Sequence, residues 1–159
     1  MQLVTPVQEH FEEMASWVKN QAQLHEWAGP NARFPCTAET LMDDFSLSKL
    51  PSYSLVDGHN VFLAFGQYYQ RLDHCHFGRL IVAPIYRGKN HQGKRIIEHL
   101  IDRLSDEGCR KLNTSVGSLF VLEGNQAAIN AYQNIGFQFS DYPGGAPFES
   151  CLYMTKSFK

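Results

Sequence analysis

A basic turn with two glycines, placed between a strand-like and a helix-like segment, limits most strongly how this chain can fold. Residues 75–82 have the composition of a strand, and residues 96–104 carry apolar side chains at helical spacing. The turn between them, residues 87–95, reads RGKNHQGKR. The first N–H groups of a helix lack internal partners and carry partial positive charge, so this order of elements favours an anion site. The turn therefore predicts a phosphate-binding loop, and a solvated basic turn is the alternative.

From Gly88 the turn matches the nucleotide-binding pattern G-x-x-x-x-G-K, but Arg95 stands where the Ser or Thr that holds Mg²⁺ is needed. The later apolar strand ends in Glu123 instead of Asp, and the strands before the turn look like consecutive hairpins. Nucleotide hydrolases of the P-loop class need the metal-binding hydroxyl, the Asp and a parallel sheet. We therefore expect the turn to bind phosphates without a dedicated magnesium ion.

The remaining elements predict one α+β domain over residues 1–159, because the chain is long enough for one full core and too short for two ordinary ones. Helices are expected over residues 6–19, from Thr37 to Phe45, from residue 96 to a stop at Gly108, and over residues 125–135. Strands are expected over residues 53–56, 61–65 and 75–82, between residues 112 and 122, and over residues 137–140 and 151–155.

Charge and hydropathy exclude several classes of protein. The chain has 16 acidic and 14 basic residues, so no overall basicity favours nucleic acid. No apolar run reaches the roughly 18–20 residues of a membrane span, and the first residues lack the apolar core of a signal peptide. The four cysteines are scattered singly, as in reduced proteins. We expect a cytoplasmic protein that binds neither nucleic acid nor membrane.

Two further segments carry a family resemblance. Residues 119–137, LFVLEGNQAAINAYQNIGF, match L-x-V-x-x-x-N-x-x-A-x-x-x-Y-x-x-x-G-F at every position. Residues 82–97, VAPIYRGKNHQGKRII, are similar to V-x-P-x-x-R-G-x-G-x-G-x-x-L-I, with a turn one residue longer and His91 where a glycine is usual. In these two motifs the chain resembles the GNAT superfamily of acetyl-CoA-dependent N-acetyltransferases.

The resemblance implies a mixed, mostly antiparallel twisted sheet of about 6–7 strands flanked by about four helices, with coenzyme A as the cofactor. In that fold two central strands part, the pantetheine arm lies between them, and the turn holds the diphosphate. The implied cofactor-binding residues are Leu80, Ile81, Val82, Arg87, Gly88, Lys89, Asn90, His91, Gln92, Gly93, Lys94, Asn125 and Tyr132.

The resemblance also implies that Tyr132 is the general acid that protonates the leaving thiolate; a buried core aromatic is the other interpretation. His76 is a candidate base, because an unperturbed imidazole has a pKa near 6.5. A structural histidine, a metal-binding pair with His74 that lacks further ligands, and Glu123 as the base are the alternatives.

For the acceptor, Trp27 and Phe34 are candidate substrate contacts, or else a lid on the core, and Asp141, Tyr142 and Glu149 form a loop that could attract a cationic amine. The resulting hypothesis is direct acetyl transfer from acetyl-CoA to a primary amine of a small molecule or peptide, by a protein of a type that often forms homodimers. The alternative is a catalytically silent CoA-binding module with a sensing or assembly role.

Overall fold

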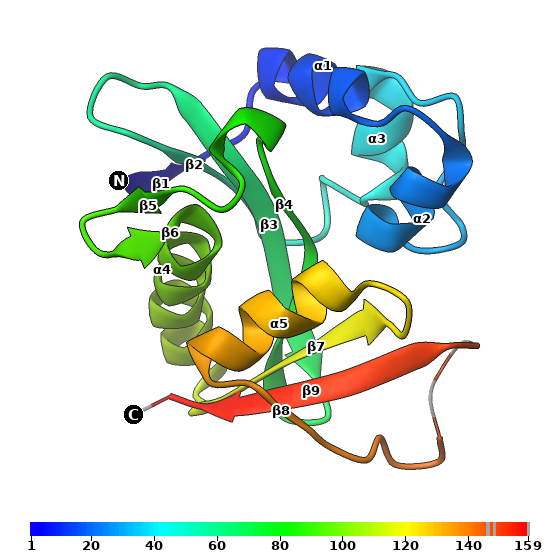
Figure 1. Ribbon diagram of the computed structural model, residues 1–159, viewed down its shortest axis with the longest axis vertical. Coiled ribbons are helices and arrows are strands. Elements are labelled where there is room, and N and C mark those ends of the chain that lie inside the picture. Colours follow the sequence, from blue (N-terminus) through cyan, green and yellow to red (C-terminus); the bar gives the residue numbers. More distant parts are fainter. Residues whose placement is uncertain (146, 148, 159) are drawn as a thin grey trace.

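The computed structural model describes residues 1–145, 147 and 149–158 and forms a seven-stranded sheet with helices on both faces (Figure 1). The elements in chain order are β1 (Gln2–Val4), α1 (Gln8–Trp17), α2 (Gln21–Ala28), α3 (Ala38–Asp44), β2 (Ser52–Val56), β3 (Phe62–Arg71), β4 (His74–Val82), the 3₁₀ helix η1 (Pro84–Tyr86), β5 (Asn90–His91), β6 (Lys94–Arg95), α4 (Ile96–Leu112), β7 (Val116–Leu122), α5 (Gln126–Ile135), β8 (Gln138–Phe139) and β9 (Cys151–Ser157).

The strand order is β1-β2-β3-β4-β7-β9-β8, and every neighbouring pair is antiparallel except β4 and β7, which run parallel. This confirms the predicted α+β class and the mixed, mostly antiparallel sheet, with five α-helices in the described part of the chain instead of about four. None of the helices in this part is long and apolar enough to span a membrane.

Two apolar cores hold the layers together. On one face, α1, α2 and α3 pack over β3 through a core that includes Phe11, Leu41 and Phe65. On the other face, α4 and α5 pack through a core that includes Leu100 and Ile129. Figure 1 shows the three N-terminal helices gathered on one side of the sheet, away from α4 and α5.

A bulge in β4 opens the middle of the sheet. Phe65 pairs with Ile81 and Gln67 with Gly78, so Gly66 of β3 stands opposite both Arg79 and Leu80. Arg79 takes the left-handed conformation, with a φ of 51°. The pairing of β4 with β7 covers only residues 75–77 and stops just before this point. Because a bulge bends and twists its strand, β4 and β7 separate from there on.

The basic turn differs from the prediction. Residues 90–95 form a small hairpin, with β5 paired to β6, and the helix begins directly after it, at Ile96 as expected. Gln92 and Gly93 at its tip both have positive φ, 53° and 82°. Two such residues form the turn that a tight hairpin requires, which explains how the chain accommodates the longer turn.

Helix α4 also ends later than predicted, because Gly108 lies within it and not at its end. The helix continues to Leu112, and Asn113 caps it in the left-handed conformation. A Cβ at Gly108 would lie 2.6 Å from Cys75 Sγ and 2.9 Å from Tyr68 Cδ2, and both side chains are buried. Glycine is therefore required here by the close approach of α4 to the sheet.

We expect Gly108→Ala to lower the free energy of unfolding by about 1–2 kcal/mol. Alanine favours a helix by up to about 1 kcal/mol over glycine, but overpacking a core costs about 1–3 kcal/mol. Denaturant titration measures the difference. Gly58→Ala is the control, because a Cβ there meets nothing within 4 Å and its φ is not positive. Equal stability of the Gly108→Ala variant and the wild type would contradict the packing described here.

Candidate functional site

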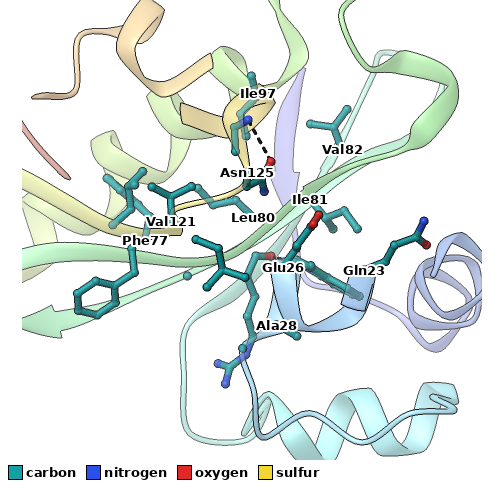
Figure 2. A pocket seen from close by; sticks show the side chains of 18 of the residues that line it. Gln23, Glu26, Ala28, Phe77, Leu80, Ile81, Val82, Ile97, Val121 and Asn125 are labelled. Atoms are coloured by element: carbon teal, nitrogen blue, oxygen red, sulfur yellow. Dashed lines mark hydrogen bonds between the residues drawn. The ribbon is translucent and has the colours of Figure 1, made fainter. Parts of the chain in front are cut away.

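A cavity of about 1360 Å³ opens where β4 and β7 part (Figure 2). Its lining comes from the end of α1, from α2, from β3, β4 and β7, from η1, from the start of α4 and from α5. Figure 2 shows Leu80 and Val121, one from each parted strand, beside Asn125, with Gln23 and Glu26 of α2 across from them. The volume exceeds the roughly 300–1,000 Å³ of most small-molecule sites, so a long ligand, or two ligands, can be accommodated.

The edge of β4 that faces the cavity contains the predicted strand residues Leu80, Ile81 and Val82, and all three line the cavity. From Gly78 onward this edge has no partner strand on the β7 side. Two carbonyl groups near it are already used: Arg79 accepts from Trp27 Nε1 at 2.8 Å, and Val82 accepts from Arg87 Nε at 3.0 Å. The rest of this edge offers backbone groups to a ligand that carries amides.

One end of the cavity has the groups that an anion site needs. Arg87, Gly88 and Arg95 line it, and Arg95 is the N-cap residue of α4, which has no side-chain cap. The first N–H groups of this 17-residue helix therefore point to the same end as two guanidinium groups. Arg95 was not among the predicted ligands, although its position directly before the helix was visible in the sequence.

The predicted loop residues Lys89, Asn90, His91, Gln92, Gly93 and Lys94 do not line the cavity. The hairpin directs them elsewhere: Lys94 Nζ pairs with Asp102 at 2.6 Å, and His99 Nε2 lies 2.8 Å from the carbonyl oxygen of His91. Of the turn residues that were predicted as ligands, only Arg87 and Gly88 line the cavity.

Helix α5 contributes the opposite wall. Asn125 caps it, accepting a hydrogen bond from the Ala128 N–H at 3.3 Å, as predicted. Alanines at positions 127, 128 and 131 line the cavity and leave room beside Tyr132. No hydrogen bond between described residues uses the Tyr132 hydroxyl, and burial raises its pKa to about 12. The phenol is therefore a protonated donor at neutral pH.

His76 lines the cavity, but its chemistry is not that of the predicted base. Its Nδ1 lies 2.8 Å from Ser118 Oγ, and its ring packs 4.7 Å from Phe120. Burial first, and then the charges of Arg71 and His74, lower its pKa to about 3. An imidazole with such a pKa is neutral and a poor proton acceptor near pH 7, so His76 is a hydrogen-bonded structural residue in this structure.

The other candidates for proton and metal chemistry are dispersed. His74 Nδ1 lies 2.9 Å from the Tyr153 hydroxyl. Among the described residues no three His, Cys, Asp or Glu side chains gather as metal ligands would. Glu123, Asp141 and Glu149 are exposed and lie outside the lining. Glu26, which had no predicted role, is the one described carboxylate that lines the cavity.

Of the two predicted substrate contacts, one lines the cavity and the other does not. Trp27 lines the cavity and holds the carbonyl of Arg79. Phe34 is 38% exposed and does not reach the lining. The Tyr142 hydroxyl of the C-terminal loop accepts a hydrogen bond from Arg71 Nη1 at 3.0 Å. The attraction of a cationic amine by this loop stays a prediction.

Comparison with known proteins gives a family and a fold. The model of the acetyltransferase (GNAT) family matches residues 12–137. A search of curated proteins found no significant match. Among solved structures, spermidine N-acetyltransferase from Vibrio cholerae in complex with CoA and spermine is 16% identical, with a TM-score of 0.69, covering 98% of this chain and 94% of that one.

Two other solved structures agree with this fold. The PaiA N-acetyltransferase from Thermoplasma acidophilum in complex with coenzyme A is 15% identical, with a TM-score of 0.67, covering 99% of this chain and 98% of that one. An acetyltransferase of the GNAT family from Staphylococcus aureus is 13% identical, with a TM-score of 0.66, covering 99% of each chain.

We expect the buried, neutral His76 to make stability depend on pH. The unfolded chain takes up a proton near pH 6.5, but the folded His76 does so only near pH 3. The contribution of His76 to the free energy of unfolding is therefore fully present above pH 6.5 and is lost as the pH drops toward 3. Between pH 7 and pH 5 it falls by about 2 kcal/mol. Denaturant titrations at both pH values measure it.

His76→Asn is the matched variant, since an amide can keep a hydrogen bond to Ser118 but does not titrate. It should lose this part of the pH dependence while retaining that of the other histidines, including His10, whose pKa is also lowered, chiefly by burial. Identical pH dependence in the variant and the wild type would show that His76 titrates normally in the folded protein.

Proposed function

Because this chain belongs to the acetyltransferase (GNAT) family, we propose that it transfers an acetyl group from acetyl-CoA to a primary amine. The observation that carries the proposal is the cavity at the parted strands, which has an anion-binding helix start at one end and the unpaired Tyr132 hydroxyl in its wall.

The residues present fit coenzyme A. Arg87, Arg95 and the first N–H groups of α4 suit a diphosphate, because guanidinium groups and helix N-termini both bind phosphate oxygens. The free edge of β4 suits the two amides of the pantetheine arm. Leu80 and Val121 provide apolar walls for the rest of that arm.

The chemistry needs few groups from the chain. Bound acetyl-CoA supplies an activated acyl thioester. Tyr132, neutral and hydrogen-bonded to no described residue, donates its proton to the sulfur that leaves when the amine attacks. The nitrogen gives up one proton as the amide forms, and a proton taken back from solvent restores the phenol, so the products are the N-acetyl amide and the CoA thiol. None of the four cysteines lines the cavity, so the described residues offer no thiol for a covalent acyl intermediate, and we propose direct transfer.

A CoA-binding module without turnover is the second candidate, and one observation favours it: His76, the predicted base, is held neutral by its low pKa. Thermal stabilisation by acetyl-CoA, compared with ATP, tests the site itself, and release of CoA thiol with a panel of amines tests turnover. Binding with no thiol release across the panel favours the module, and release that requires an amine favours the enzyme.

We expect Tyr132→Phe to lower kcat by about 100-fold, in the range typical of a lost general acid, while the Kd for acetyl-CoA stays within twofold. Steady-state thiol release and calorimetry measure the two quantities. Tyr53→Phe is the control, because that hydroxyl bonds Glu107 outside the cavity and should leave kcat unchanged. An unchanged kcat in Tyr132→Phe would remove Tyr132 from the proposed role.

We also expect Arg95→Gln to weaken the binding of CoA about 10-fold, as the loss of one charge-assisted hydrogen bond does. Lys94→Gln is the matched change at the adjacent residue, and it should have less than a twofold effect because Lys94 pairs with Asp102. Neither change should alter the use of an acetyl-pantetheine thioester, which lacks the diphosphate. If both variants weakened CoA binding equally, the phosphate site would lie at the hairpin and not at the start of the helix.

A further inference from the structure

Arg71, in the wall of the cavity, is a cation that forms no ion pair with the described residues. Its guanidinium group lies 5.1 Å from the centre of the Phe120 ring and 5.7 Å from that of Tyr69. Its Nη1 donates to the neutral Tyr142 hydroxyl, and its buried Nε has no hydrogen-bond partner. No carboxylate of the described residues forms an ion pair with Arg71.

The position of Arg71 separates it from the proposed phosphate site. Arg71 pairs with His74, the first residue of β4. Arg87 bonds the carbonyl of Val82, the last residue of β4. The strand has nine residues, so at ~3.3 Å per residue its two ends lie about 26 Å apart. Arg71 therefore belongs to the end of the cavity away from the diphosphate.

The physical cost of this arrangement points to a ligand. Removing an arginine from water without an opposite charge is unfavourable unless something compensates for the lost hydration. Burial lowers the pKa of the half-buried Arg71, but hydrogen bonds with Tyr142 and Tyr69 raise it by more, so the guanidinium group keeps its charge although neither phenol supplies an opposite one. The whole lining has five cationic side chains and one carboxylate, Glu26. A negative group supplied by the second substrate would complete the pairing.

We propose, on the basis of the acyltransferase function above, that Arg71 binds a carboxylate of the acceptor, which is thus a carboxylate-bearing amine of the amino-acid class. A planar guanidinium group matches a carboxylate in a two-point contact. The rings of Trp27, Tyr69 and Phe120 line the cavity and provide an apolar surface for the rest of such a molecule. A polyamine has no group for Arg71, and its ammonium charges would be repelled by it.

The test compares amines that differ only in the carboxylate. Thiol release from acetyl-CoA is measured with L-phenylalanine against phenethylamine, with 6-aminohexanoate against pentylamine, and with spermidine. We expect kcat/KM to be at least 10-fold higher for the acid of the pair that fits the cavity. Arg71→Gln should lower kcat/KM for that acid by 10- to 100-fold, through KM, and leave kcat/KM for the partner amine that lacks the carboxylate, and the Kd for acetyl-CoA, unchanged. Arg71→Lys should restore part of the loss.

Arg33→Gln is the control variant, because Arg33 lies outside the cavity lining and pairs with Asp43 and Asp44; its kinetics should equal those of the wild type. The inference would be overturned if amines without a carboxylate, spermidine included, had kcat/KM values as high as those of the acids and if Arg71→Gln changed none of these values. That result would leave the acyltransferase function intact.

A second measurement keeps the inference testable if no amine releases thiol, a result that would count against the proposed function. Calorimetry then compares N-acetylphenylalanine with N-phenethylacetamide on the protein saturated with CoA. Binding of the acid alone, lost in Arg71→Gln, supports a carboxylate site at Arg71. Binding of both, or of neither, overturns it.

Discussion

The bulge at Arg79 is the constraint on which the rest of the site depends, and three contacts from other elements hold it. Trp27 Nε1 donates to the Arg79 carbonyl at 2.8 Å, while Arg79 Nη1 donates to Gln67 Oε1 at 2.8 Å and its guanidinium lies 5.0 Å from the centre of the Phe45 ring. A Cβ on the facing Gly66 would lie 2.8 Å from side-chain atoms of Leu80 and Leu104, so a larger residue there would require both leucine side chains to move. The bulge ends the β4–β7 ladder, and without that end no cavity would lie between the strands.

Charge is distributed along the cavity in a way that the net charge of −2 does not suggest. Arg87 and Arg95 lie at the end where α4 begins, and Arg71 lies at the other end of β4. Between them Tyr132 and His76 are both uncharged near neutral pH, because burial raises the pKa of the first and lowers that of the second. Arg79, at the bulge between the two ends, also lines the cavity, but its guanidinium group bonds Gln67 and packs on Phe45. The proposed polyanionic and acidic substrates would therefore meet their cations at opposite ends of the cavity.

Local patterns in the sequence predicted much of the fold and part of the site. Asn125 caps α5, Asp57 accepts from the N–H groups of residues 59 and 61 in the first hairpin, and helix α3 begins after Thr37, because each depends on neighbours a few residues away. The missed features depend on distant contacts. The pKa of His76 is set by burial under Phe120, and Arg71 meets Tyr142 only through the folded sheet. The edge strand β1 has three residues, too few for a periodic pattern.

The three residue pairs between β4 and β7 also have a mechanical consequence. Among the described residues, they are the only strand pairing that joins the β1–β4 half of the sheet to the β7–β9–β8 half. Beyond these three pairs the two halves face each other across the aperture of the cavity through side chains, Leu80 and Val121 among them. Trimming those two side chains would widen the aperture for bulkier acyl chains without breaking a single strand pairing.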